Sequence, residues 1–246
     1  MKTAPLLAGA MLLSGMAGAA EISVLSTQAP QEAYLELVAQ FEKATGHKVR
    51  TDFTGTVNVQ KRLAAGESFD LIIMAAPAID EQIKLGRALA GSRVDFAKSG
   101  TGVAVRKGAP RPDIGSVEAL RRTLLSARSI GYSTGPSGVY MLGVFERLGV
   151  ADQVKGKLKQ TPSGVFVGTL IASGEVEIGF QQISELVHFP GIDYVGPLPG
   201  DLQRMTVFSA GVHSGAKQAD AARDLVKFLT APGAAAVIRK HGLEPA

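Results

Sequence analysis

Five short segments of the chain are rich in hydroxyl, amide and glycine residues and contain neither Lys nor Arg. Each follows a stretch that reads as a β-strand or opens a predicted helix. Side-chain O–H and N–H groups, together with the free backbone N–H groups of a helix N-terminus, can hold an anion without a salt bridge. The segments are residues 26–30, 54–58, 133–138, 161–164 and 181–182.

Serine, threonine and glycine before a helix also serve as ordinary N-caps and turns, which is the commoner explanation of any single segment. Recurrence at several predicted strand ends favours a binding site, because ligands of open α/β sheets bind at those ends. We expect direct ligand contacts from Thr27, Thr56, Ser137, Gly164 and Gln182. Additional candidates for ligand contact are Ser26, Gln28, Thr54, Asn58, Ser133, Thr134, Tyr140 and Ser163.

Patterns typical of metal sites and of common catalytic sites do not occur in the sequence. The four histidines have no metal-like spacing, and there is neither a phosphate-binding P-loop nor a G-x-S-x-G turn. Glu175, Glu177 and the pair Lys61-Arg62 are typical of solvated surface. We therefore expect no metal and no cofactor.

The N-terminus predicts export. Met1-Lys2 is followed by an apolar run from Ala4 to Met16 and by small residues at 17–20, the order of a secretory signal peptide. The run is short for a bilayer-spanning helix, which needs about 20 apolar residues. We expect residues 1–20 to be cleaved and the protein to be periplasmic. No cysteine is present, so neither a lipid anchor nor a disulfide is expected.

The charge balance argues against nucleic acid as a partner. The formal net charge is +4, the basic residues are scattered, and there is no Trp. This mild positive balance is compatible with a small anionic ligand.

Short β-rich runs alternate with segments of helical periodicity, which predicts an α/β fold with parallel strands and crossover helices. We expect strands at residues 22–25, 48–53, 70–74, 101–105, 129–132, 176–180, 194–195 and 205–208. We expect helices at residues 31–45, 57–65, 78–85, 116–127, 137–148, 165–173, 219–229 and 234–241.

The strand runs near residues 101–105 and 204–208 are candidates for two crossings between lobes. Two crossings imply a discontinuous first lobe, residues 21–100 plus 208–246, and a second lobe, residues 101–207.

Several stretches resemble the periplasmic molybdate-binding proteins of ABC importers. They include Glu21–Ala29, the run Phe69-Asp-Leu-Ile-Ile-Met-Ala75, and Pro136-Ser-Gly-Val-Tyr140, which looks like that family's P-A-G-x-Y helix start. The C-terminal runs at 228–233 and 238–242 are also similar. The resemblance implies a class-II periplasmic binding fold, with two α/β lobes that are joined by two crossing strands and close on the ligand. It also implies a monomer, a small anionic ligand and an ABC permease partner.

The resemblance carries the family's anion site onto specific residues. The first-loop serine falls on Ala29, the second-loop serine on Thr56, the backbone donors on Ser137 and Gly164, and the tyrosine on Gln182. The lost hydroxyl and the replaced tyrosine, together with added polar side chains, point to a larger ligand with more oxygens, such as a di- or tricarboxylate.

Two other functions stay open. Periplasmic aconitate isomerases are similar to the same group, and interconversion of cis- and trans-aconitate needs a base and an acid. Tyr140, His188 or a carboxylate brought in by folding could serve, and the sequence singles out none. A protein that reports ligand binding to a membrane receptor is the third possibility.

Overall fold

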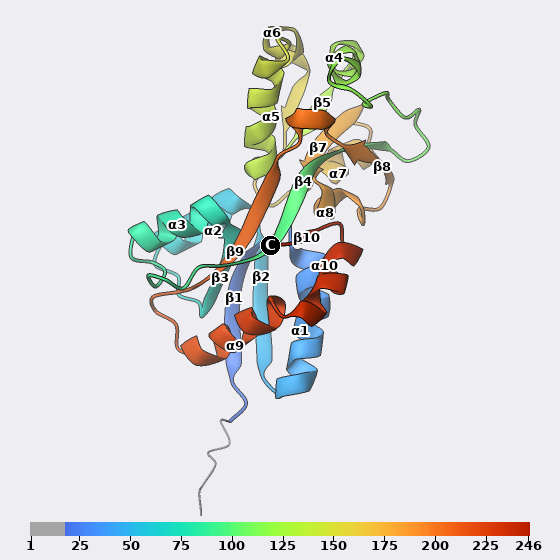
Figure 1. The fold of residues 1–246 in the computed structure, drawn as a ribbon. Coiled ribbons are helices and arrows are strands. Elements are labelled where there is room, and N and C mark those ends of the chain that lie inside the picture. Colours follow the sequence, from blue (N-terminus) through green and yellow to red (C-terminus); the bar gives the residue numbers. More distant parts are fainter. Residues whose placement is uncertain (1–17) are drawn as a thin grey trace, which may run out of the picture.

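The computed structural model describes residues 18–246, so most of the predicted signal peptide, residues 1–20, lies outside the described residues. The described chain builds two lobes around one continuous, twisted sheet (Figure 1). Two long strands lie side by side where the halves of the molecule join, β4 (Val94–Arg106), which pairs in both halves, and β9 (Met205–Val212), which pairs with β3 and with the first part of β4. Within residues 18–246, none of the helices has the length and apolar composition needed to cross a membrane.

The first lobe consists of segments from both ends of the chain. Its elements are β1 (Glu21–Thr27), α1 (Gln31–Thr45), β2 (Lys48–Thr54), α2 (Thr56–Ala64), β3 (Leu71–Ala75), α3 (Ala76–Lys84), α9 (Ala219–Leu229), η3 (Pro232–Ala234), α10 (Ala235–Lys240) and β10 (Glu244–Pro245).

The second lobe is formed by the middle of the chain. Its elements are α4 (Val117–Ser126), β5 (Ile130–Tyr132), α5 (Pro136–Arg147), α6 (Ala151–Val154), η1 (Lys155–Lys157), β6 (Leu158–Gln160), α7 (Val167–Ala172), β7 (Ile178–Gln182), α8 (Ile183–Leu186), β8 (Ile192–Pro197) and η2 (Gly200–Leu202).

The strand order is β2-β1-β3-β9-β4-β7-β5-β6, with β8 and β10 also paired to β4. Strands β1, β2 and β3 run parallel, as do β5, β6 and β7. Strand β9 lies antiparallel to β3, with Ile73 opposite Ala210. Parallel strands joined by helices place their carboxyl ends along one edge, which is where the hydroxyl-rich segments begin.

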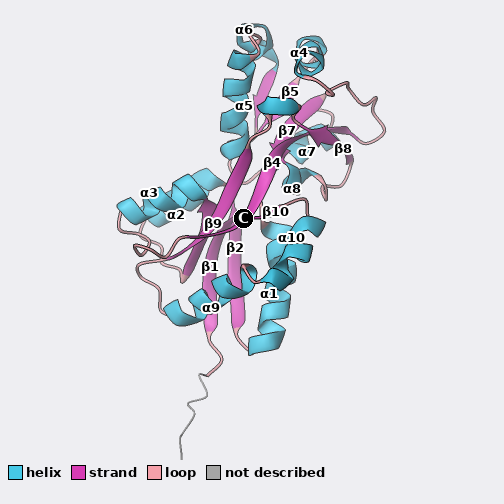
Figure 2. Cartoon of the chain, in the orientation of Figure 1, coloured by secondary structure: helices cyan, strands magenta, loops and turns pink. Residues whose placement is uncertain are grey.

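Strand β4 passes from one half of the sheet to the other, as the strands in Figure 2 show. Its residues 94–100 pair with β9 and β10, whereas residues 101–106 pair with β7 and β8. The Gln203 side chain adds a link beside this passage: its Oε1 accepts from the Thr101 N–H at 3.0 Å and its Nε2 donates to the Thr101 carbonyl at 2.9 Å. The proposed lobe limits at residues 100 and 208 stay a prediction.

The first lobe buries apolar side chains on both faces of its sheet. Strand β3 shows this, since Leu71 and Ile73 pack with α1, α9 and α10, whereas Ile72 and Met74 pack with α2 and α3. Alternate residues of a strand point to opposite faces, so a continuous apolar run is needed here.

The second lobe repeats this arrangement with fewer strands. One cluster joins α4, α5 and α6 to the sheet, and within it the rings of Phe145 and Phe180 meet edge to face at 6.3 Å between centroids. A smaller cluster on the other face holds α7 and α8 through Val167, Ile171 and Leu186. Buried apolar contact of this kind stabilises a fold that has no disulfide.

The predicted elements exist, with several differences in extent. The strand predicted at 101–105 is only the second half of β4, because residues 94–100 mix charged and small residues. The edge strand expected at 194–195 spans Ile192–Pro197, and β9 continues to Val212. The short elements α6, η1, β6, α8, η2 and β10 were not expected from the sequence.

The strand predicted at 176–180 lies two residues further on, at Ile178–Gln182. Gln181 and Gln182 are therefore buried strand residues and do not form a loop after the strand. Amides in a buried strand need hydrogen-bond partners, and the partners of both come from distant segments.

Candidate functional site

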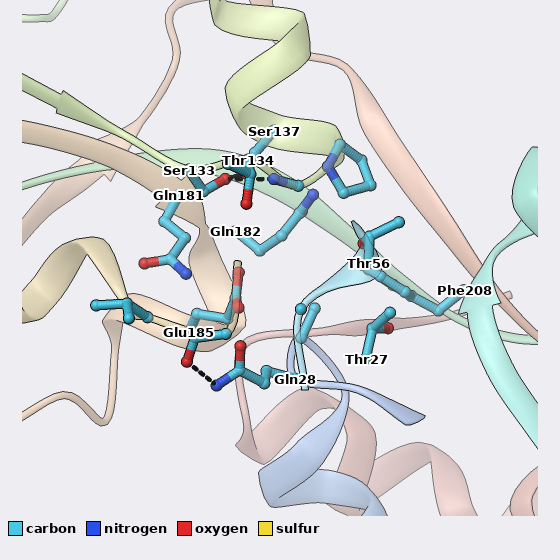
Figure 3. Close-up of a pocket in the computed structure, with 16 residues that line it drawn as sticks. Thr27, Gln28, Thr56, Ser133, Thr134, Ser137, Gln181, Gln182, Glu185 and Phe208 are labelled. Atoms are coloured by element: carbon cyan, nitrogen blue, oxygen red, sulfur yellow. Dashed lines mark hydrogen bonds between the residues drawn. The ribbon is translucent and has the colours of Figure 1, made fainter. Parts of the chain in front are cut away.

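A cavity lies between the lobes, beside the carboxyl ends of β1 and β7 and the first turns of α2 and α5 (Figure 3). The empty space among its lining residues, including the mouth open to solvent, is about 400 Å³. Its lining is mostly small and polar. The residues are Thr27, Gln28, Ala29, Gly55, Thr56, Ser133, Thr134, Gly135, Pro136, Ser137, Gly164, Val165, Gln181, Gln182, Glu185 and Phe208.

Thr27 is the last residue of β1, and it lines the cavity from the first lobe. It follows Leu25 on the same face of the strand, so its side chain is directed toward the buried α2 side. Thr27 is only 4% exposed, and its Oγ1 has no hydrogen-bond partner. A buried hydroxyl without a partner costs about 1–3 kcal/mol, which a ligand oxygen can recover.

The start of α5 lines the cavity from the second lobe. Pro136 occupies the first turn, where its missing N–H is not needed by the helix. Gly138 allows the helix to pack directly on the preceding loop, since a Cβ at this position would lie 1.7 Å from the Ser133 carbonyl oxygen. The Ser133 Oγ accepts from the Gly135 N–H at 3.2 Å and lies 3.3 Å from the Ser137 Oγ. The loop therefore holds the first turn of a twelve-residue helix at the cavity.

Helix capping does not account for the hydroxyl-rich segments at the cavity. No side chain caps the N-terminus of α1, α2 or α5. By contrast, α4 lies away from the cavity and is capped by Ser116, whose Oγ accepts from the Ala119 N–H at 3.1 Å. The first-turn N–H groups of α2 and α5 lack intrahelical acceptors, and the helix dipoles make these ends favourable for negative charge.

Three hydrogen bonds hold the lobes together at the mouth of the cavity. Gln28 Nε2 donates to the Gly164 carbonyl at 3.1 Å. Asn58 donates twice to Ser163, from Nδ2 to the carbonyl at 3.1 Å and from its backbone N–H to Oγ at 3.3 Å. We call Gln28, Asn58, Ser163 and Gly164 the clasp. Gly55 fits beneath it, because a Cβ there would lie 2.4 Å from the Gly164 nitrogen.

The Gln182 side chain is buried where β7 meets the two long strands. Its amide nitrogen donates to the carbonyls of Ser99 at 3.0 Å and Gly100 at 3.2 Å, and its oxygen accepts from Thr206 Oγ1 at 3.0 Å. With the opposite amide orientation, the Gln182 side-chain oxygen would face the carbonyl oxygens of Ser99 and Gly100. Gln182 lines the cavity while both of its amide N–H donors join β7 to β4, and its contact with a ligand stays a prediction.

Glu185 projects into the cavity from α8, one turn beyond the end of β7. Burial raises the pKa of its carboxyl to about 7, although hydrogen bonds from the Gln181 side chain and the Gln182 backbone oppose this shift. Gln181 is itself held in place, because its Oε1 accepts from the Val167 N–H at 2.7 Å.

Among the cavity-lining residues that the structure describes, Glu185 is the one with an ionisable side chain, and none is Lys, Arg or His. In residues 18–246 no group of three side chains is arranged to hold a metal ion. The site thus offers neutral hydrogen-bond donors, apolar side chains at Ala29, Pro136, Val165 and Phe208, and one carboxyl that can exchange a proton near neutral pH.

The structure brings together most of the residues predicted to contact a ligand. Those that line the cavity are Thr27, Gln28, Thr56, Ser133, Thr134, Ser137, Gly164 and Gln182. Contact of any of them with a ligand stays a prediction.

Five predicted residues do not line the cavity, each for a local reason. The Ser26 hydroxyl donates to the backbone carbonyl of the next residue, Thr27, at 2.9 Å. Thr54, Asn58 and Ser163 lie at the clasp, where Thr54 Oγ1 accepts from Asn58 Nδ2 at 3.1 Å. The Tyr140 hydroxyl donates to the Leu202 carbonyl at 2.9 Å, away from the cavity.

Sequence reasoning missed Gln181 and Glu185 as cavity residues. The available signal was a short turn, Ile183-Ser-Glu-Leu186, directly after a buried strand, with a single carboxylate among apolar neighbours. Glu175 and Glu177 were treated as solvated, and both are exposed.

Comparison with known proteins identifies the family. The family model of the bacterial extracellular solute-binding protein matches residues 22–244. An aconitate isomerase from Pseudomonas sp. is 36% identical over 91% of this chain and 87% of that protein. The molybdate-binding protein ModA of Azotobacter vinelandii is 31% identical over 95% and 94% of the two chains. A solved structure of an Azotobacter vinelandii periplasmic molybdate-binding protein aligns with a TM-score of 0.76 at 20% identity, covering 90% of this chain and 98% of that one. The chain therefore belongs to the bacterial extracellular solute-binding protein family.

Proposed function

We propose that this protein captures a small anion with several oxygens, a di- or tricarboxylate, between its lobes in the periplasm and presents it to an ABC permease. The observation that carries the proposal is Thr27, a buried hydroxyl at the cavity whose oxygen has no partner in the protein. Few buried polar atoms of native proteins lack a partner, and an oxygen atom of a ligand in the cavity would supply one for Thr27.

The lining supports an anionic ligand held by neutral donors. Thr27 and Thr56 contribute from the first lobe, and Ser133, Thr134 and the first turn of α5 contribute from the second. Two lobes that supply donors to one ligand are drawn together when it binds, which is the hinge closure typical of such proteins.

The lining also supports a ligand larger than a tetrahedral oxyanion. Polar groups of Thr27 and Thr56 line the cavity on one side and those of Ser133, Thr134 and Ser137 on the other, so a ligand with several oxygens can be met from both lobes. ModA of Azotobacter vinelandii, at 31% identity, is named for molybdate, so molybdate is the natural competitor in a test.

The test is isothermal titration calorimetry of the mature protein with trans-aconitate, cis-aconitate, citrate, molybdate and sulfate. We expect one site per chain and the tightest binding for a carboxylate. Binding of molybdate alone would contradict the preference for carboxylates, and binding of none of the five would contradict the anion site.

Thr27→Val locates the binding, and Thr161→Val is its matched control. Thr27 and Thr161 are the two buried hydroxyls without a partner in residues 18–246, and only Thr27 lines the cavity. We expect Thr27→Val to weaken anion binding about 5- to 100-fold, the equivalent of about 1–3 kcal/mol, and Thr161→Val to leave it unchanged. Equal effects of the two variants would remove the special role of Thr27.

A second function is favoured by Glu185 and by the aconitate isomerase from Pseudomonas sp. The same cleft could bind aconitate and convert its cis and trans forms, with no ligand passed to a permease. A binding site for anions does not need an ionisable carboxyl in its lining, whereas an isomerisation through a carbanion needs a base.

A further inference from the structure

Glu185 differs from every other cavity residue in that it can accept and release a proton. It is half-buried on α8 and lines the same cavity as Thr27 and Ser137. No Lys, Arg or His of the described lining neutralises it. A negative charge beside an anion would weaken binding, so a site built for anion capture alone gains nothing from this carboxyl.

Two residues of β7, Gln181 and Gln182, lie beside the carboxyl of Glu185. The Gln181 oxygen is occupied by the Val167 N–H at 2.7 Å, which turns the Gln181 amide N–H₂ toward Glu185. The backbone N–H of Gln182 is the second donor to the carboxyl. These donors come from strand β7 and from the start of α8, both packed in the core of the second lobe. A carboxyl that lines the cavity, with donors beside it, is within reach of a bound ligand, and such reach is what proton transfer requires.

We propose that Glu185 is the catalytic base and acid of an allylic proton shift on an unsaturated tricarboxylate bound in the cleft, of which aconitate is the probe substrate. This inference rests on the proposed function, since it requires a tricarboxylate to occupy the site. It assigns the residue, which the family relationship does not.

The step is balanced without any cofactor. The Glu185 carboxylate takes a proton from the CH₂ carbon of aconitate, and the C–H electron pair becomes a new C=C bond to the central carbon. The original C=C pair moves to the far carbon and is shared with its carboxylate. Glu185, now protonated, returns the proton to that far carbon. The double bond has then moved to a bond about which rotation was free, so cis and trans forms interconvert.

The rest of the lining suits this step. Charge that develops on the ligand carboxylates is met by Thr27, Ser137 and the first-turn N–H groups of α5. Because burial raises the Glu185 pKa to about 7, both its ionised and its protonated forms are populated near neutral pH. A base and its conjugate acid are most useful when both are available in this way.

The experiment compares the wild-type protein with Glu185→Gln, Glu185→Asp and Glu146→Gln, which alters an exposed carboxylate on α5 outside the cavity. Conversion of trans- to cis-aconitate is followed by chromatography, and binding is measured by calorimetry. We expect wild type and Glu146→Gln to convert the substrate. We expect Glu185→Gln to lose at least about 100-fold in kcat while it still binds, and Glu185→Asp to recover part of the rate.

The pH profile adds a readout that a structural role would not change. The ionised carboxylate is the base, so kcat/KM of the wild type should rise with pH through about 7. In D₂O the product should gain deuterium at the far carbon whenever the abstracted proton exchanges with solvent before its return.

The outcomes separate the two proposals. If the wild type binds none of the carboxylates, the proposed function fails. If it binds trans-aconitate but does not convert it, or if Glu185→Gln converts it at the wild-type rate, this inference fails and the binding function stands.

Discussion

Asp70 in the first lobe is buried and Glu185 in the second is half-buried, and the pKa values of their carboxyls move in opposite directions. Burial alone would raise the pKa of Asp70. Hydrogen bonds from the Ser23 N–H at 2.8 Å, the Ser23 hydroxyl at 2.7 Å, and the backbone N–H groups of Gln218 at 2.7 Å and Lys217 at 2.8 Å outweigh burial and bring the pKa below its usual range. For Glu185, burial prevails and raises the pKa to about 7.

The number and rigidity of the donors separate a structural carboxylate from one that can do chemistry. Both carboxylate oxygens of Asp70 accept hydrogen bonds, one from Ser23 on β1 and the other from the segment that enters α9. The ionised carboxylate therefore links two parts of the first lobe. Glu185 has fewer opposing donors and faces a cavity. A carboxyl with a pKa near 7 that faces a cavity can exchange its proton with a ligand.

The largest effect on stability is expected for Asp70→Asn. The new amide N–H₂ would face at least one backbone N–H donor, and we expect the free energy of unfolding at pH 7 to fall by about 2–4 kcal/mol in urea denaturation. Asp224→Asn, which removes an exposed ion pair to Lys227 on α9, is the control and should cost less than about 1 kcal/mol.

The pH dependence sharpens the Asp70 test. Because the pKa of Asp70 is lower in the folded protein than in the unfolded chain, its ionised carboxylate stabilises the fold at pH values above the unfolded-state pKa. This stabilisation is lost as the pH falls through the folded-state pKa. The deficit of Asp70→Asn should therefore shrink below about pH 4. A deficit that is constant from pH 7 to pH 3 would show that the charge of Asp70 is not what stabilises the lobe.

Glu185→Gln should raise the free energy of unfolding, by less than Asp70→Asn lowers it. Because the folded-state pKa of about 7 lies above the usual 4.5, the native state holds its proton over a range in which the unfolded chain releases it. Wild-type stability should fall as the pH rises from about 4.5 to about 7. We expect Glu185→Gln to be about 1–3 kcal/mol more stable than wild type at pH 8 and nearly equal at pH 4, in thermal or urea unfolding. Equal stability at both pH values would refute the raised pKa.

The clasp gives the smallest expected effect. Asn58→Ala removes the Nδ2 donor to the Ser163 carbonyl, and we expect ligand affinity to fall about three- to tenfold, the equivalent of about 1 kcal/mol. Gln60→Ala on the same helix is the control, since its amide contacts Glu81 within the first lobe. Small-angle scattering of the ligand-free protein should show a more open Asn58→Ala variant. A clasp variant that binds as tightly as the control would show that closure does not depend on Asn58.

Local patterns predicted the alternation of strands and helices well, because apolar periodicity reports directly which face of an element is buried. The run Asp70–Met74 and the helix at 31–45 are examples, and both are present within one residue. The first half of β4 was missed because it is stabilised by β9, more than a hundred residues away, and not by its own composition.

The site was predicted less completely than the fold. Position after a strand identified Thr27, Thr56 and Ser137 as cavity residues, since strand ends converge at one edge of the sheet. The sequence could not show that the amide of Gln182 donates its hydrogen bonds to β4, or that Asn58 in one lobe donates to Ser163 in the other. It also could not show the raised pKa of Glu185, which arises from desolvation by segments distant in the chain.

A crystal structure of the Glu185→Gln protein with the anion that binds most tightly in calorimetry tests the interlobe anion site most directly. We expect the ligand between the lobes, with one oxygen within hydrogen-bonding distance of Thr27 Oγ1 and another at the first-turn N–H groups of α5. A ligand bound outside this cavity, with Thr27 Oγ1 still lacking a partner, would contradict this expectation.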